Sequence, residues 1–134
     1  MARLETRLAE AEAALATLDE AVATLPRSLV ERDSAILRLI YTFEAVWKAC
    51  RQLLADREGI DVGSPNAAIR AARRLGWLTD DEAQAAIEIG RDRNLAVHLY
   101  RAELGAEIEQ RLAGHAAVLR RWLDAMKERA AGES

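Results

Sequence analysis

The chain has 134 residues, of which 51% are hydrophobic and 31% charged, and its formal net charge is −3. This length supports one domain with its own core, residues 1–134, and the composition excludes a disordered chain. The slight negative charge excludes a protein that binds nucleic acid through bulk charge, so any such contact needs a local basic patch. Only seven glycines and two prolines, beside abundant Ala, Leu, Arg and Glu, indicate an all-α fold.

The single cysteine excludes an internal disulfide and a cysteine-based metal cluster. Cys50 lies between Trp47 and Leu53 on an apolar helix face, which predicts a buried structural thiol. Charged residues interrupt the first ten positions, so no signal-peptide pattern is present there. No segment approaches the roughly 20 apolar residues that span a bilayer. We therefore expect a cytoplasmic protein that does not contact a membrane.

The first predicted helix carries apolar residues at alternating spacings of four and three, and Pro26 ends it. These residues are Leu4, Leu8, Ala11, Leu15, Leu18, Val22 and Leu25. The pattern is typical of a bundle helix that packs on its neighbours, and a short dimeric coiled coil is the alternative.

Capping patterns mark where the next helices begin. Ser28 with Glu31 predicts the start of a second helix, whose apolar face continues to a stop before Gly59. A Ser-Pro pair at 64–65 opens a short third helix to about Leu75, with Gly76 as its stop.

The second half of the chain predicts two more helices. Thr79 with Glu82 forms another capping pattern and opens a fourth helix, and a fifth follows from about Arg101. We expect the tail at 130–134 to be frayed. Five helices with short connections, four long and one short, predict an antiparallel up-and-down bundle.

The end of the fourth helix holds the candidate chemistry, the stretch 93–100 of sequence RNLAVHLY. Arg93 offers bidentate hydrogen bonds to a phosphate, and His98 is a candidate general base or acid because the ordinary pKa of a histidine side chain lies near neutrality. Together with Asn94, which would orient the phosphate or His98, they suffice for RNA cleavage by the RNA's own 2′-hydroxyl. The plain structural alternative is that Arg93 and His98 only satisfy a helix end and a bundle contact.

Helical geometry separates the two catalytic candidates. Residues five apart point about 140° from each other on an ideal helix, so Arg93 and His98 do not share a face. Either the helix loosens here, or the two residues meet partners across a subunit interface. A symmetric dimer would bring two such stretches into one cleft.

Three further groups of residues attract attention. Glu44 and Lys48 are spaced for an ion pair on the second helix, beside an aromatic pair at 43 and 47. The densest basic patch is on the third helix, and the fourth helix adds to it. These residues are candidates for binding RNA or a protein partner, and the alternative is that they are solvated arginines without a specific partner. They are Arg70, Arg73, Arg74 and Arg91. His115 falls at core spacing and is interpreted as structural or interfacial, and no His/Cys/Asp/Glu set has metal-ligand spacing.

These motifs resemble a known family. Residues 42–48, TFEAVWK, resemble the Phe-Glu-x-x-Trp-Lys signature of the nucleotidyltransferase substrate-binding proteins, a branch of the HEPN superfamily that includes HepT-like toxins. Ser64-Pro65 with the segment 71–78 is similar to that family's third helix and its exit. Residues 92–100 are similar to its Arg-x4-His-x-Tyr motif. The resemblance spans about residues 3–128.

The resemblance implies a homodimer with the Arg-His motifs facing a shared cleft, encoded beside a minimal nucleotidyltransferase. In toxin–antitoxin pairs of this kind, the chain would be a metal-independent ribonuclease that needs no cofactor. Arg93 and His98 would be catalytic, with Asn94 and Glu44 supporting them. The partner would silence the toxin by attaching AMP to Tyr100, since bulky anionic groups there would crowd and neutralise the cleft.

This sequence also departs from the family's pattern. Many members carry an acidic residue one turn before the Phe-Glu pair, where this chain has LIY at 39–41, and the residues flanking His98 are apolar. A drier cleft is therefore expected. The alternatives are a non-catalytic subunit that binds the nucleotidyltransferase and holds a nucleotide for it, and a purely structural helical dimer.

Overall fold

The computed structural model describes residues 2–132 and confirms an all-α chain. The helices, in chain order, are α1 (Ala2–Ala23), α2 (Leu29–Leu53), α3 (Pro65–Arg74), α4 (Asp80–Leu99) and α5 (Ala102–Gly132). Four are long and α3 is short, as predicted.

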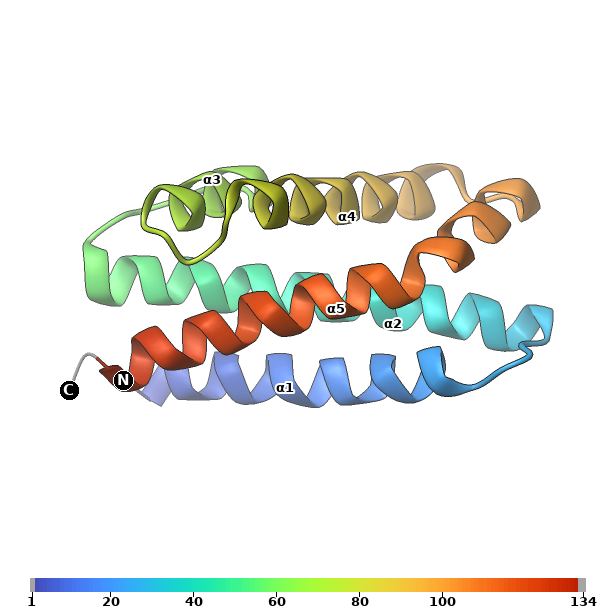
Figure 1. Cartoon of the computed structure of the whole chain (residues 1–134), viewed down its shortest axis with the longest axis horizontal. Helices are drawn as coiled ribbons and strands as arrows, with labels where there is room; N and C mark the ends of the chain where they lie inside the picture. The colour runs from blue at the N-terminus through green and yellow to red at the C-terminus, as the bar shows by residue number, and fades with distance from the viewer. Residues whose placement is uncertain (1, 133–134) are drawn as a thin grey trace.

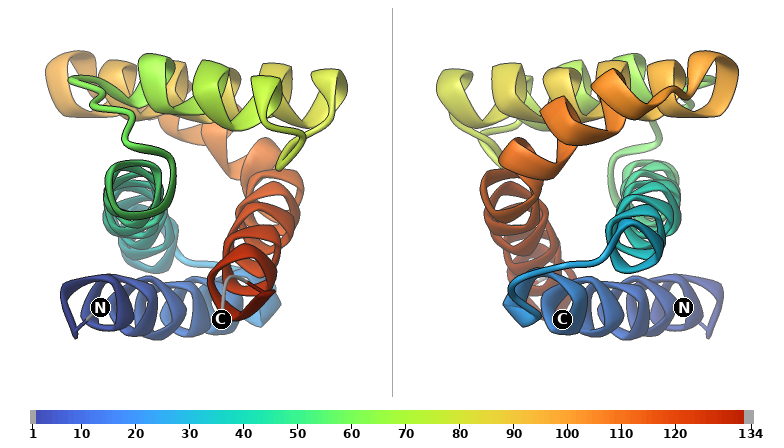
Figure 2. Two further views of the ribbon diagram at one scale, coloured as in Figure 1. Left: turned by 90° about the vertical axis from the view of Figure 1, so that its left-hand side faces the viewer. Right: turned by 90° about the vertical axis from the view of Figure 1, so that its right-hand side faces the viewer.

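The four long helices alternate in direction. Figure 1 shows α1 and α4 running one way along the bundle while α2 and α5 return, so the described ends of the chain lie at the same end of the molecule. Seen end-on in Figure 2, α1, α2 and α5 form three sides of the bundle. The short α3 lies beside α4, and together they form the fourth side. The predicted antiparallel up-and-down bundle is confirmed.

The predicted helix starts are confirmed at atomic detail. Ser28 Oγ accepts a hydrogen bond from the Glu31 amide, and Glu31 accepts one from the Ser28 amide. Thr79 and Glu82 form the same reciprocal pair at the start of α4. Both capping boxes satisfy amides that would otherwise lack a partner. They fix where α2 and α4 begin, and therefore the register of the two helices that carry the site.

Two expectations about helix ends are wrong. Leu25 does not extend the apolar seam of α1, because the helix ends at Ala23 and Leu25 is 71% exposed. The tail is helical through Gly132, because Ala130 packs on the core and its carbonyl accepts a hydrogen bond from Arg57 Nη1 at 3.1 Å. Residues 133–134 of the predicted frayed tail lie outside the described residues.

The end of α2 also holds a feature that the sequence does not indicate. A single π-helical turn, η1 (Leu54–Glu58), continues α2, and Gly59 then ends it in a left-handed conformation with φ 66°. The predicted stop at Gly59 is therefore confirmed, since glycine adopts positive φ without steric cost.

The core lies between the helices and holds the side chains that the apolar pattern predicts. Leu4, Leu15 and Leu18 of α1 are fully buried within the single chain, which supports the bundle interpretation over a coiled coil between chains. Cys50 is buried as predicted, and burial raises the pKa of its thiol to about 12. None of the described helices combines the length and apolar character needed to cross a bilayer.

Candidate functional site

Helix α4 stays α-helical through Leu99, so the candidate stretch does not loosen. Tyr100 then leaves the helix in an extended conformation, with ψ 125°. On such a helix the directions of Arg93 and His98 differ by about 140°. The structure therefore does not bring these two side chains to one face within the chain, and the expectation of a helix that loosens between them is wrong.

Arg93 points to α2 and meets the predicted aromatic and acidic residues there. Its Nη1 lies 3.1 Å from Glu44 Oε1, and its guanidinium carbon lies 5.5 Å from the centre of the Phe43 ring. Glu44 Oε2 accepts a hydrogen bond from Trp47 Nε1 at 3.4 Å and lies 4.0 Å from Lys48 Nζ, which confirms the predicted Glu44–Lys48 pair. The two sequence motifs thus form one cluster across α2 and α4.

Close packing of α4 on α2 makes this cluster possible. A Cβ atom placed on Gly90 would lie only 3.1 Å from Phe43 Cζ, so any larger residue there would have to shift the Phe43 ring by a few tenths of an ångström. Arg93 keeps 24% of its side chain exposed. Its Nε atom and Glu44 Oε1 are buried and form no hydrogen bond, so charge alone holds the pair together.

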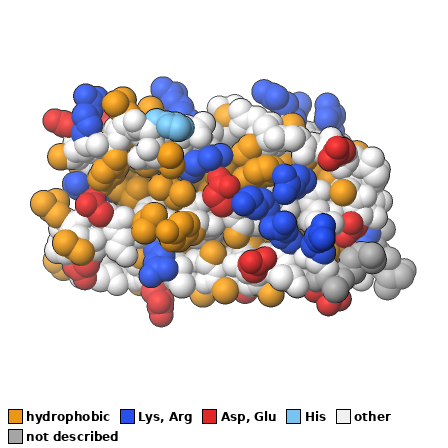
Figure 3. Space-filling model, turned by 180° about the vertical axis from the view of Figure 1, so that it is seen from behind, with side chains coloured by type: hydrophobic (Ala, Val, Ile, Leu, Met, Phe, Trp, Pro, Cys, Tyr) orange, Lys and Arg blue, Asp and Glu red, His pale blue; other side chains and the backbone are white. Residues whose placement is uncertain are grey.

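His98 and Asn94 are exposed on α4. Within residues 2–132, His98 has no hydrogen-bond or ion-pair partner, so its imidazole is available to a ligand or to another chain. Its neighbours in sequence, Val97 and Leu99, are exposed and apolar. Figure 3 shows hydrophobic side chains gathered over one half of this face, with a histidine at their edge. We call this set the apolar face: Leu37 and Tyr41 of α2, and Val97 and Tyr100 of α4 and its C-terminal end.

Tyr100 is anchored although it is 40% exposed. Its hydroxyl donates a hydrogen bond to Asp33 Oδ1 at the start of α2. Gly105 makes room for this arrangement, since a Cβ there would lie 2.5 Å from the Tyr100 hydroxyl and 2.8 Å from Arg32 Nη2. Partial burial, then the hydrogen bond to Asp33 and its negative charge, raise the pKa of Tyr100.

A buried polar network behind Arg93 was not predicted. Asp92 accepts hydrogen bonds from Arg111 Nε and Nη2, each at 2.8 Å, and its Oδ2 lies 2.7 Å from His115 Nε2. Burial alone would raise the pKa of Asp92, but its bonds to His115 and Arg111 outweigh that and lower it to about 2. His115 is structural, as interpreted. The missed signal was that Arg111 and His115 are four apart and share one face of α5.

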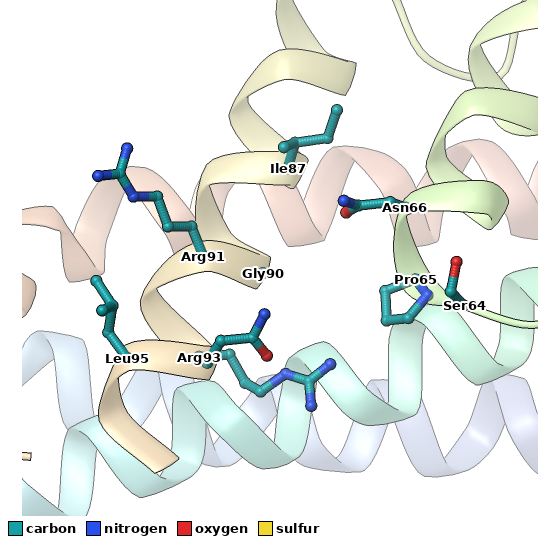
Figure 4. A pocket seen from close by; sticks show the side chains of 9 residues that line it. Ser64, Pro65, Asn66, Ile87, Gly90, Arg91, Arg93 and Leu95 are labelled. Carbon is teal, nitrogen blue, oxygen red and sulfur yellow. The ribbon is translucent and has the colours of Figure 1, made fainter. Parts of the chain in front are cut away.

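The predicted basic patch is exposed but does not form one cluster of free cations. Arg70, Arg73 and Arg74 lie exposed on α3, and Arg73 pairs with Asp80 at 3.4 Å. Figure 4 shows Arg91 and Arg93 pointing to opposite sides of α4. Among residues 2–132, no group of three or more His, Cys, Asp or Glu side chains is placed to hold a metal ion.

The chain matches a family model described as nucleotidyltransferase substrate binding protein like, over residues 6–128. Its fold is similar to the crystal structure of a Thermus thermophilus protein, with 44% identity, 87% of this chain and 98% of that chain covered, and a TM-score of 0.82. Among curated proteins, no relative matches the chain.

Two other solved structures share the fold at lower identity. One is a mutant of the toxin–antitoxin MntA–HpeT, at 17% identity, with 92% of this chain and 96% of that chain covered and a TM-score of 0.76. The other is a tri-AMPylated Shewanella oneidensis HEPN toxin in complex with an MNT antitoxin, at 16% identity, with the same coverage and a TM-score of 0.75. The chain therefore belongs to the nucleotidyltransferase substrate binding protein like family and shares its fold with HEPN toxins.

Proposed function

We propose that this chain is the toxin of a toxin–antitoxin pair, a homodimeric ribonuclease that needs no metal ion and uses Arg93 and His98. The observation that carries the proposal is the state of Arg93. Its guanidinium is held over Phe43 and beside Glu44 by charge, without a complete set of hydrogen bonds, and is partly exposed. A phosphate can therefore take up its remaining donors without breaking a closed network.

The reaction would be transesterification within the RNA. The 2′-oxygen attacks the adjacent phosphorus, the bond from phosphorus to the 5′-oxygen breaks, and the products are a 2′,3′-cyclic phosphate and a 5′-hydroxyl. His98 would take the 2′-hydroxyl proton or give a proton to the leaving oxygen, and Arg93 would stabilise the charge that develops on the phosphate. Asn94 and Glu44 would support these roles, Glu44 by orienting Arg93.

A dimer would unite the two catalytic groups. Arg93 and His98 diverge on one α4, so a shared cleft must combine one protomer's arginine with its partner's histidine. The apolar face adjoins His98 and is the kind of surface that two copies would cover. The exposed arginines 70, 73, 74 and 91 would then contact RNA phosphates or a protein partner outside the cleft.

The partner would be a nucleotidyltransferase antitoxin. The HEPN toxin that this fold resembles is described as AMPylated and in complex with an MNT antitoxin. By that analogy, the Tyr100 oxygen would form a bond to the α-phosphorus of ATP, with release of pyrophosphate and of the hydroxyl proton. Tyr100 is exposed at the edge of the apolar face, where added AMP would obstruct both dimer and cleft.

A second candidate is a non-catalytic subunit that presents a nucleotide to the nucleotidyltransferase, in keeping with the family's description as substrate binding. Both are tested by inducing the wild type, Arg93→Ala and His98→Ala in cells and running total RNA on a gel. The ribonuclease predicts growth arrest and degraded RNA with the wild type alone. If all three cells grow alike, with folded protein and intact RNA, the ribonuclease is wrong and the binding subunit is favoured.

A further inference from the structure

A pocket of about 410 Å³ lies beside Arg93, between the start of α3 and the middle of α4. Figure 4 shows Pro65 and Asn66 on its α3 side and Ile87 and Gly90 on its α4 side, with the Arg93 side chain extending across below them. The mechanism proposed above uses Arg93 and Asn94 at this position but leaves the rest of the pocket unassigned. Its size falls in the range of roughly 300–1,000 Å³ that small-ligand sites occupy.

The walls of the pocket are mostly apolar, with a few polar groups. Pro65, Ile87 and Leu95 offer flat or branched hydrocarbon surface, which suits a planar ring. Such a surface excludes water from a base or a similar ring without specifying its identity.

The charge at the pocket is positive. Arg91 and Arg93 are the charged residues that line it, and no carboxylate does so among the described residues. Arg93 Nη1 is paired with Glu44, but a guanidinium carries five N–H donors, so the pair leaves others for a ligand. Arg91 points away in Figure 4, and its charge stays at the rim. An anionic group is therefore favoured beside Arg93.

Two amides approach the pocket from different helices. Asn66 projects from α3 toward α4 in Figure 4, and Asn94 lines the pocket from α4. An amide offers one acceptor and two donors, the combination that pairs with the edge of a nucleobase or with sugar hydroxyls. Asn66 is exposed and its side chain has no partner within residues 2–132, so a ligand can bind it without displacing a protein contact.

We propose that this pocket binds a nucleotide, with the phosphate at Arg93 and the nucleoside between Pro65 and Ile87, within reach of Asn66 and Asn94. The inference rests on the proposed function in one respect: in a ribonuclease, the pocket would hold the nucleoside next to the cleaved bond and so select the cleavage site. A free mononucleotide and one residue of an RNA chain share this chemistry.

Calorimetric titration of the purified full chain tests the proposal. The probes are AMP, UMP, inorganic phosphate and a short 2′-O-methyl oligonucleotide, which cannot be cleaved because its nucleophile is blocked. Asn66→Asp removes the amide donors offered to the nucleoside and adds a negative charge to a pocket that binds an anion, and a carboxylate in the first turn of α3 is compatible with folding. Gln110→Asp, at an exposed position on α5, makes the same charge change away from the pocket.

The proposal predicts that the nucleotides bind more tightly than phosphate, and that Asn66→Asp weakens them by about tenfold or more. Gln110→Asp should leave binding unchanged. If the oligonucleotide binds more tightly than AMP and shows the same loss, the occupant is RNA; if AMP binds as well as the oligonucleotide, it is a free nucleotide. The proposal that this pocket binds a nucleotide would be wrong if phosphate bound as tightly as AMP. It would also be wrong if Asn66→Asp and Gln110→Asp bound AMP with equal affinity.

His98→Ala separates this inference from the proposed function, since His98 does not line the pocket. The variant should lose RNA cleavage and keep nucleotide binding. A wild type that binds nucleotides through Asn66 but cleaves no RNA would refute the ribonuclease and keep the pocket. A wild type that cleaves RNA but binds no nucleotide would refute the nucleotide pocket and keep the ribonuclease.

Discussion

At the scale of single residues, the site is built from weakly satisfied polar groups placed on rigid helices. Arg93 is held by one ion pair with Glu44 and by the face of Phe43, and His98 stands exposed. Turning such a side chain toward a ligand lowers the stability of the fold only slightly, because a partly exposed ion pair contributes at most about 1 kcal/mol to the free energy of unfolding. Tyr100 differs, since Asp33 holds its hydroxyl in one place.

The Tyr100–Asp33 contact makes a prediction that does not depend on the function. Asp33→Asn removes the negative charge that favours the protonated phenol and leaves a weaker, neutral acceptor for its hydrogen bond, so the pKa of Tyr100 should fall toward its ordinary value. Ultraviolet absorbance titration of tyrosinate measures it, in a Tyr41→Phe background that leaves Tyr100 as the remaining tyrosine. An unchanged or higher pKa in Asp33→Asn would show that the contact does not form in solution.

At the scale of elements, the Asp92 network joins α4 to α5 behind the site. Asp92 is buried and is bonded to both Arg111 and His115 of α5. Because Asp92 precedes Arg93 directly, this network fixes the rotation of α4 that turns Arg93 toward α2. We expect it to position Arg93, the proposed catalytic residue, without touching a substrate.

Asp92→Asn should lower the free energy of unfolding by about 2 kcal/mol at neutral pH, because it leaves the buried His115 poorly paired and removes the charge that the partly exposed Arg111 binds. The pKa of Asp92 is depressed in the fold, from 3.8 to about 2. Its contribution is therefore complete above pH 4 to 5 and is lost as the pH falls toward 2. Denaturant unfolding of the two proteins across this range measures the difference, which should shrink with acid. A difference that stays constant from pH 7 to 2 would contradict the role of the Asp92 charge.

The start and register of each helix could be predicted from the sequence, because capping boxes and apolar spacing are local signals. Ser28 with Glu31 and Thr79 with Glu82 are confirmed on this basis. Contacts between side chains of different helices were harder to predict from the sequence. The meeting of Arg93 with Glu44 depends on the crossing of α2 and α4, and the Asp92 network on that of α4 and α5, so periodicity within one helix reveals neither partner.

At the scale of the whole molecule, the exposure of the apolar face to solvent has no explanation if the chain is a monomer. Leu37, Tyr41 and Val97 are each 45–55% exposed, although residues of this kind usually face a core or an interface. The face lies beside His98, where the proposed reaction needs a second copy of the chain. Dimerisation and catalysis are therefore expected to fail together.

Val97→Asp should convert the proposed dimer to a monomer, since it would place a charge in each half of a symmetric interface. Sedimentation velocity measures the change. Leu25→Asp is the matched control, because Leu25 is more exposed than Val97 but lies outside the apolar face. A wild type that is monomeric at the concentrations used for activity, or a Val97→Asp protein that stays dimeric, would contradict this assignment of the interface.

The central claim is that Arg93 and His98 cleave RNA through its own 2′-hydroxyl, and the most direct measurement is the chemistry of the products. Purified protein is incubated in a metal chelator with an RNA oligonucleotide and with the same sequence carrying 2′-deoxy residues, and the termini are identified by mass spectrometry. The account predicts cleavage of the RNA alone, to 2′,3′-cyclic phosphate and 5′-hydroxyl ends, and none by Arg93→Ala or His98→Ala. Cleavage of the deoxy oligonucleotide, 5′-phosphate ends, or full activity in either variant would contradict it.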